Sequence, residues 1–183
     1  MIRNMDYEGL KARIAQAANV EKVLGGAATE ICDAFLADRL TIYKAVDNGT
    51  ALAAVVQMGL ETFGSVKVRI DSNRSVAGYV AAHRRVVNIR DAYDDEELAP
   101  LEMQHKMLRA IDERTGYRTT QILAAPVLSG ERLVGVIELL NRKDGRRFSR
   151  SEDSGSLPRC FRGSTRESSS APMWPTTSSP VSR

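Results

Sequence analysis

The chain has 183 residues, of which 43% are hydrophobic and 27% are charged, close to the usage of ordinary globular proteins. This composition can build one packed core and excludes a chain that is disordered throughout. The formal net charge is +3, but residues 149–183 carry five arginines against three acidic residues and so supply +2 of it. Because basic and acidic residues alternate in the nearly neutral remainder, we expect no nucleic-acid partner.

The sequence indicates neither a membrane segment nor a metal centre. Its longest apolar run, residues 122–128, is far shorter than the ~20 residues that cross a bilayer, and the N-terminus opens no signal-like region. We therefore expect a cytoplasmic protein without membrane insertion. Two cysteines and two histidines form no CxxC pair and no four-ligand zinc spacing, so we also expect no disulfide framework and no structural zinc.

The N-terminal part of the chain has helical periodicity. A loose pattern covers residues 6–17, and apolar residues at i, i+3, i+4 and i+7 predict an amphipathic helix over 20–36. Gly25 and Gly26 lie inside that helix, where each costs about 1 kcal/mol relative to alanine. Because such small residues let another helix approach closely, a homodimer through these N-terminal helices is one expectation.

A β-hairpin is predicted next. Residues 39–46 alternate apolar and polar side chains, and residues 51–57 return as a second strand. Between them, Asp47-Asn48-Gly49-Thr50 contains residue types that accept positive φ angles, as tight hairpin turns require. A third short strand is predicted over residues 66–70.

The middle of the chain is predicted to form short elements. Ser75 is placed to cap a short helix that ends near His83, and residues 86–89 then form an extended segment. The acidic stretch 91–97 has the residue types of a divalent-cation site. We interpret it instead as a solvated loop that leads into a helix, because a helix dipole favours negative charge near its N-terminus.

That helix is predicted to begin at Pro100, which suits a first helical turn, and to end at Gly116. Strands over residues 119–128 and 133–140 follow, joined by the polar turn 129–132. Their near-continuous apolar runs are typical of a sheet that is covered on both faces. The predicted fold class is therefore α+β, with a single antiparallel sheet between helical layers.

Several segments together resemble one known family. The segments SVAGYVA and VVNIRDAY, residues 75–81 and 86–93, resemble the central part of GAF domains, which are small-molecule sensor modules of phosphodiesterases and bacterial regulators. The later segments ILAAPV and LVGVIELLNRK, residues 122–127 and 133–143, are similar to the last GAF strands. The resemblance covers about residues 8–153 and implies a six-stranded antiparallel sheet. It also implies that the first and last helices lie on one face of that sheet, and that a ligand pocket roofed by the middle helices lies on the other.

Among GAF domains, the chain looks most like those that precede the motor of type II and type IV pilus secretion ATPases, through residues 38–43 and 114–119. In cyclic-nucleotide-binding GAF domains an Asn-Lys, a Phe and an Asp-Glu support the pocket. Here Asn141 is followed by arginine, Phe148 is present, and the acidic pair is Glu152-Asp153. A cyclic nucleotide therefore stays a candidate ligand without support from the motif. Bilin-binding relatives need a cysteine near the pocket helices, and the chain has none there, so no bilin is expected.

The resemblance implies a regulatory module that binds a small molecule, passes its occupancy to a partner and has no catalysis of its own. It places the ligand among five residues: Tyr79, Asn88, Asp91, Thr119 and Gln121. Asn141, Phe148, Glu152 and Asp153 would support the pocket. The residues also admit structural roles, since Asn88 and Asp91 can cap a turn, Tyr79 can belong to the core, and side chains can fill the pocket. The second hypothesis is a ligand-free dimerisation or interaction module, such as a fragment of a secretion ATPase or of another signalling protein.

The last part of the chain differs in composition from the rest. Residues 149–183 hold 11 of the 15 serines and 4 of the 6 prolines, a bias that cannot repay the entropy of ordering. The sequence SGSLP at residues 154–158 also interrupts the helix that would close a GAF domain. We expect a sensor domain over residues 1–153 and a disordered Ser/Pro/Arg-rich tail over 154–183. The tail is expected to be foreign to the domain, as it would be if a frameshift had changed the reading frame.

Overall fold

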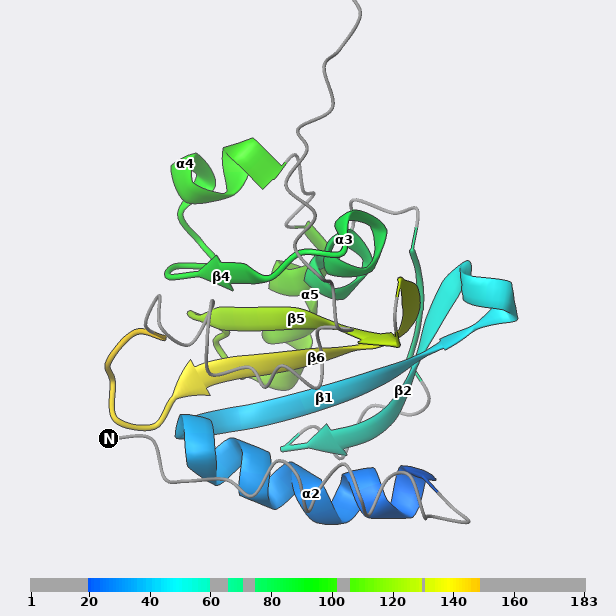
Figure 1. The fold of residues 1–183 in the computed structure, drawn as a ribbon. Helices are drawn as coiled ribbons and strands as arrows, with labels where there is room; N and C mark the ends of the chain where they lie inside the picture. The colour runs from blue at the N-terminus through cyan, green and yellow to red at the C-terminus, as the bar shows by residue number, and fades with distance from the viewer. Residues whose placement is uncertain (1–19, 60–65, 71–74, 102–105, 130, 149–183) are drawn as a thin grey trace, which may run out of the picture.

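The computed structural model describes residues 20–59, 66–70, 75–101, 106–129 and 131–148. Their elements in chain order are α2 (Val20–Phe35), β1 (Ala37–Val46), η1 (Asp47–Gly49), β2 (Ala51–Met58), β3 (Lys67–Arg69), α3 (Val76–His83), β4 (Val87–Ile89), α4 (Asp95–Leu98), η2 (Ala99–Leu101), α5 (Lys106–Thr115), β5 (Ile122–Ser129) and β6 (Arg132–Arg142). The strands form one six-stranded antiparallel sheet in the order β3-β2-β1-β6-β5-β4 (Figure 1). The α+β fold class with a six-stranded antiparallel sheet is therefore confirmed.

The hairpin of β1 and β2 forms where the turn residues predict it. Asp47, Asn48 and Gly49 all have positive φ angles, of 51°, 54° and 82°. Asparagine, aspartate and glycine tolerate this region better than other residues, which is why the chain reverses here. Beyond the hairpin, β1 pairs with β6 along most of its length, so these two strands form the centre of the sheet.

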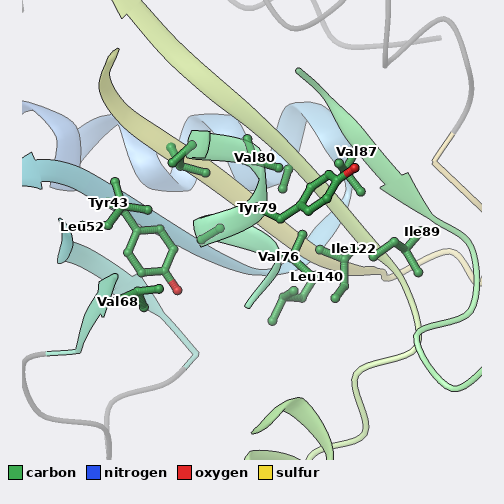
Figure 2. Packing of buried hydrophobic residues seen from close by; sticks show 14 of the residues in the cluster. Tyr43, Leu52, Val68, Val76, Tyr79, Val80, Val87, Ile89, Ile122 and Leu140 are labelled. Atoms are coloured by element: carbon green, nitrogen blue, oxygen red, sulfur yellow. The ribbon is translucent and has the colours of Figure 1, made fainter. Parts of the chain in front are cut away.

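The two faces of the sheet carry separate apolar clusters. Toward α2 lie the buried residues that we call the α2-face cluster, among them Phe35, Leu40, Ile42, Leu123, Ile137, Leu139 and Phe148. On the opposite face, under α3, lies the α3-face cluster, which includes Tyr43, Leu52, Val68, Tyr79, Val80, Ile122 and Leu140 (Figure 2). Figure 1 shows the two helices on opposite sides of the strands. Because successive side chains of a strand alternate between faces, each central strand contributes to both clusters.

The helical segment after β4 differs from the prediction of one helix that begins at Pro100. A short helix, α4, precedes that residue, and Pro100 lies in the 3₁₀ turn η2. The reason is a capping interaction, because the Asp94 side chain accepts hydrogen bonds from the backbone N–H groups of Glu96 and Glu97 at 2.9 and 3.2 Å. Part of the acidic stretch therefore forms the first turn of a helix itself, rather than a loop that leads into one.

Strand β5 begins at Ile122, three residues later than the predicted start at residue 119. The delay has a local cause: the backbone N–H groups of Thr120 and Gln121 both donate to the Asn141 side chain, at 2.8 Å, instead of to a neighbouring strand. The predicted helix over residues 6–17, the acidic pair at 152–153 and the tail lie outside the described residues. Within the described part of the chain, no helix is both long and apolar enough to cross a membrane.

Candidate functional site

A cavity of about 100 Å³ lies between α5 and the sheet face opposite α2, and we call it the α5 cavity. Its floor comes from β1, β2 and β6, and its wall from α5 and the segment that follows it. The lining consists of Arg39, Thr41, Tyr43, Gln57, Val66, Leu108, Ile111, Asp112, Thr115, Tyr117, Thr119, Glu138 and Leu140. A second, wider depression lies beside the hairpin turn. We treat it as the weaker candidate, because two of its three charged residues, Asp47 and Lys67, pair with each other at 2.6 Å.

The floor of the α5 cavity contains a row of polar residues across three strands. Strand register pairs Gln57 of β2 with Thr41 of β1, and Thr41 with Glu138 of β6. Residues paired in this way share one face of the sheet, with Cβ atoms about 5 Å apart. We call Gln57, Thr41 and Glu138 the polar row. It brings a carboxylate, a hydroxyl and an amide side by side on the floor of the cavity.

Glu138 is the titratable centre of this row. The Tyr43 hydroxyl donates a hydrogen bond to Glu138 Oε2 at 3.2 Å. Burial raises the pKa of Glu138 from 4.5 to about 7, while the Tyr43 hydrogen bond acts in the opposite direction. The same burial and the neighbouring Glu138 raise the pKa of Tyr43 well above its ordinary value. Near neutral pH the carboxyl group is thus poised between its protonated and ionised forms, and Tyr43 stays a donor.

Asp112 on α5 holds the wall of the cavity together. Its Oδ1 accepts a hydrogen bond from the Thr119 hydroxyl at 2.9 Å. Its Oδ2 accepts from the Thr119 backbone N–H at 2.7 Å and from the Tyr93 hydroxyl at 2.9 Å. Asp112 is buried, and each of these bonds satisfies one of its acceptor positions. The carboxylate therefore ties α5 both to the segment before β5 and to the loop after β4.

Asn141, at the end of β6, supports the same wall from behind. Its side-chain oxygen accepts from the backbone of Thr120 and Gln121 and from the Thr120 hydroxyl, and its amide donates to Tyr117 and Arg118, all at 2.8–2.9 Å. The residue has a positive φ of 45°, a conformation that asparagine adopts more readily than most residues. One side chain thus fixes the path of residues 117–121.

Tyr117, also in the lining, joins the wall to the first strand. Its hydroxyl donates to the Asp38 carboxylate at 2.9 Å, and the Arg39 guanidinium lies over its ring at 3.4 Å from the ring centre. Burial and the neighbouring Asp38 carboxylate raise the pKa of Tyr117 above its ordinary value. Arg39 is therefore engaged with an aromatic face, an arrangement that stabilises a cation beside a ring.

The five residues predicted to surround a ligand lie in different places. Thr119 lines the α5 cavity. Tyr79 lies in the α3-face cluster (Figure 2). Its hydroxyl accepts from Arg85, and its ring stacks on His83 with the ring centres 4.0 Å apart. Asp91 is exposed, and its Oδ1 accepts from the Tyr93 backbone N–H at 2.9 Å.

Asn88 and Gln121 are associated with the α2 side of the sheet. Asn88 pairs in register with Leu123 of the α2-face cluster, and its side chain donates to the Phe148 carbonyl at 3.1 Å. Gln121 precedes Leu123 by two residues, and its side-chain oxygen is buried without a hydrogen-bond partner among the described residues. Of the nine residues named from the sequence, Thr119 lies in the cavity lining, and Asn141 lies directly behind it.

Apart from Thr119, the lining residues of the cavity were not named from the sequence, and the most important of those missed are Tyr43, Asp112 and Glu138. A signal for Glu138 is present in the sequence, because it is the one acidic residue in the apolar run LVGVIELL over residues 133–140. A carboxylate in a strand predicted to be buried on both faces needs a partner. The partner, Tyr43, is 95 residues away, and local patterns do not reveal it.

Comparison with known proteins gives one consistent family. The family model of the GAF domain matches residues 19–154. The chain is 32% identical over 108 residues to the Probable 3',5'-cyclic phosphodiesterase pde-5 of Caenorhabditis elegans, a match that covers 59% of this chain and 13% of that protein. The chain thus spans only a small part of the length of this curated relative.

Solved structures share the fold at low sequence identity. The GAF domain from a phosphoenolpyruvate-protein phosphotransferase of Coxiella burnetii has a TM-score of 0.60 and 17% identity, covering 80% of this chain and 81% of that one. Residues 122 to 287 of a methyl-accepting chemotaxis protein have a TM-score of 0.59 and 22% identity, covering 78% and 85%. The free methionine-R-sulfoxide reductase of Neisseria meningitidis, solved with its substrate, has a TM-score of 0.59 and 13% identity, covering 84% and 82%.

These structural likenesses show the fold, which regulatory domains and enzymes share. The family model shows more, because it covers most of the chain and includes the described sheet, α5 and the cavity residues between them. This chain therefore belongs to the GAF domain family, a family of regulatory, small-molecule-binding signalling modules.

Proposed function

We propose that this chain is a sensor module that binds a small molecule in the α5 cavity and has no catalytic activity of its own. The observation that carries the proposal is the cavity itself. It lies between α5 and the sheet, and its lining combines aliphatic and aromatic side chains with polar groups that are held by hydrogen bonds. Concave, largely apolar sites with few oriented polar groups are the usual form of small-molecule sites.

The volume of the cavity supports a very small ligand. Pockets for drug-sized ligands measure about 300–1,000 Å³. The α5 cavity, as the described residues bound it, has about 100 Å³. This volume favours a compact ligand over one of the size of a cyclic nucleotide, the substrate class in the name of the Caenorhabditis elegans relative. A ligand of a few non-hydrogen atoms fits this volume.

The surroundings of the described cysteine support a role without catalysis. Some proteins with this fold are methionine sulfoxide reductases. Cys32, the free cysteine within the described residues, lies in the α2-face cluster, on the other side of the sheet from the cavity. Burial raises the pKa of its thiol to about 11, so the reactive thiolate is scarce at neutral pH.

A ligand in the α5 cavity would act on the elements that line it. The wall segment 117–121 is held between Asp112 and Asn141, and Asp112 also reaches the loop after β4 through Tyr93. Occupancy would therefore bias the position of α5 relative to β4. Membership of the GAF domain family, whose members are signalling modules, supports an output through an attached or associated domain.

A thermal-shift screen of small metabolites tests the proposal. A compound at 100 times its dissociation constant should stabilise the protein by about 2.7 kcal/mol. The variant Ile111→Phe adds a ring at the cavity lining and should lose the response, while Glu113→Phe, on the exposed side of α5, should keep it. If no compound stabilises the wild type more than it stabilises Ile111→Phe, the cavity is not a ligand site.

A further inference from the structure

The charged groups around the α5 cavity are not balanced. Its lining includes two carboxylates, Asp112 and Glu138, and one guanidinium, Arg39. Asp112 accepts three hydrogen bonds from Thr119 and Tyr93. Arg39 lies over the Tyr117 ring. Neither group is therefore the natural partner for something that enters the cavity, which leaves Glu138.

Glu138 has acceptor capacity that its protein partners do not fill. A carboxylate offers about four lone-pair positions on two oxygens. Within the described residues the Tyr43 hydroxyl donates to Oε2. The side chain keeps some accessible surface, and it lies in the lining of the cavity rather than on the outside of the domain. Its second oxygen is therefore available to a hydrogen-bond donor on a ligand.

The neighbours of Glu138 suit a compact cation. Gln57, which lies across the fully buried Thr41 in the polar row, also lines the cavity and carries an amide oxygen that can act as a further acceptor. An ammonium group has three donors and no acceptor, so it matches a carboxylate that has unfilled acceptor positions. In a region shielded from water, an opposite charge beside a carboxylate stabilises the ionised form far more than it does in bulk solvent.

We propose, on the basis of the sensor function above, that the α5 cavity recognises a small primary ammonium compound and that Glu138, positioned by Tyr43, binds its cationic nitrogen. The cavity volume limits the ligand to a few non-hydrogen atoms. The ligand is bound, not transformed, because recognition here uses hydrogen bonds and charge alone. Thr115, on α5 in the wall of the cavity, is placed to contact the other end of such a molecule.

A matched pair of probes tests the charge requirement. Ethanolamine and ethylene glycol have the same number of non-hydrogen atoms and share one hydroxyl, but only ethanolamine carries an ammonium group. Binding is measured by titration calorimetry and by thermal shift at pH 8, with sodium chloride added to the ethylene glycol samples to equalise ionic strength. Ethanolamine should bind the wild type and ethylene glycol should not do so at the same concentration.

Two variants assign the effect to one carboxylate. Glu138→Gln keeps the size of the side chain and an acceptor for Tyr43, and it should lose about tenfold or more of the affinity for ethanolamine, as expected when a charged hydrogen bond is removed. Glu131→Gln removes an exposed acid beside the β5–β6 turn and should bind ethanolamine like the wild type. Circular dichroism of both variants shows that they fold.

The outcomes separate this inference from the function on which it rests. If ethylene glycol binds as well as ethanolamine, or if Glu138→Gln retains the affinity, the ammonium assignment is wrong. The sensor function then still stands when other small compounds stabilise the wild type and fail to stabilise Ile111→Phe. If neither ethanolamine nor any compound of the screen binds, the sensor function fails, and this inference fails with it.

Discussion

The two faces of the sheet use the same strands in opposite ways. Toward α2, the buried side chains of Leu40, Ile42 and Leu139 pack into an apolar cluster. Toward α5, the residues between them, Thr41 and Glu138, form a polar floor beside a cavity. Because neighbours along a strand point to opposite faces, every polar residue of the floor is flanked by residues that are packed on the other side. Packing on the α2 side therefore holds the strands that carry the polar floor of the α5 cavity.

The energetic roles of the faces differ accordingly. Each large side chain that is buried toward α2 contributes about 1.5–3 kcal/mol of transfer free energy to folding. The floor of the cavity contributes a buried carboxylate, whose ionised form is disfavoured there, as the raised pKa of Glu138 shows. Four substitutions, ordered from the largest expected effect to the smallest, would break or sharpen this contrast.

Truncating the packed face should have the largest effect. Phe35 is 1% exposed and belongs to the α2-face cluster. Phe35→Ala should lower the free energy of unfolding by about 3–5 kcal/mol, from lost burial and the cavity left behind. Urea unfolding measures this value. Leu36→Ala is the control, because Leu36 is 42% exposed and should change stability by less than about 1 kcal/mol. A similar loss in both variants would contradict the packing of α2 on the sheet.

Neutralising Glu138 on the polar floor should raise the free energy of unfolding rather than lower it. The folded-state pKa of Glu138 is raised from 4.5 to about 7, so the folded protein holds this proton more tightly than the unfolded chain does. The stability it contributes is fully present below pH 4.5 and is lost as pH rises through 7. At pH 8 the ionised carboxylate therefore costs about 3 kcal/mol, from 1.36 kcal/mol per pKa unit.

Glu138→Gln should accordingly stabilise the protein by up to about 3 kcal/mol at pH 8 and have little effect at pH 4. Urea unfolding of wild type and variant at both pH values measures the difference. Glu131→Gln should show no such pH dependence. If Glu138→Gln destabilises the protein at pH 8, the carboxylate is held by interactions stronger than the Tyr43 hydrogen bond.

Substitution of Asp112 in the wall of the cavity should change the free energy of unfolding by an intermediate amount. Asp112→Ala removes both carboxylate oxygens, so the hydrogen bonds from Thr119 and Tyr93 are lost. We expect a loss of about 2 kcal/mol, since an unpaired buried polar group costs about 1–3 kcal/mol. Thermal unfolding compares this variant with Asp95→Ala, which truncates an exposed acid of α4. Equal melting temperatures would mean that Asp112 does not hold the wall.

The exposed loop should show the smallest effect. Asp91 Oδ1 accepts from the Tyr93 backbone N–H, a turn that asparagine forms equally well. Asp91→Asn should therefore leave the stability and the ligand response of the wild type unchanged. Asp91→Ala removes the acceptor and should cost about 0.5–1 kcal/mol. If Asp91→Asn loses the ligand response while its melting temperature is unchanged, Asp91 contacts the ligand.

Most of the sheet could be predicted from the sequence because its signals are local. Asp47-Asn48-Gly49 specifies the turn of the hairpin, and Ser75 caps α3 by accepting from the Gly78 backbone N–H at 3.1 Å. The errors occurred where a single side chain competes for backbone groups. Asp94 starts α4 before Pro100, and Asn141 delays the start of β5. Hydrophobic periodicity and secondary-structure propensity do not reveal which side chain will hydrogen-bond to the backbone in this way.

The candidate site was less predictable for a geometric reason. Thr119 could be placed from the family resemblance, but the pair of Tyr43 and Glu138 depends on the pairing of β1 with β6. The resemblance also assigned Asn88 to the ligand, whereas Asn88 donates to the Phe148 carbonyl on the α2 side of the sheet. Which face a residue of a short strand occupies changes with a shift of one residue in register, so a segment-level resemblance does not determine it.

The hydrogen bonds of the cavity also suggest an order of assembly. Asn141 contacts residues only 20–24 positions earlier in the chain, whereas Tyr43 and Glu138 are 95 positions apart. Contacts across short loops form at a lower entropic cost, so we expect the wall held by Asn141 to form early in folding, with the β5–β6 hairpin. Pulsed hydrogen exchange during refolding would detect it as early protection of the Thr120 and Gln121 amides. Glu138 would then acquire the Tyr43 hydroxyl only when β1 docks, which makes the hydrogen bond at the centre of the cavity one of the last to form.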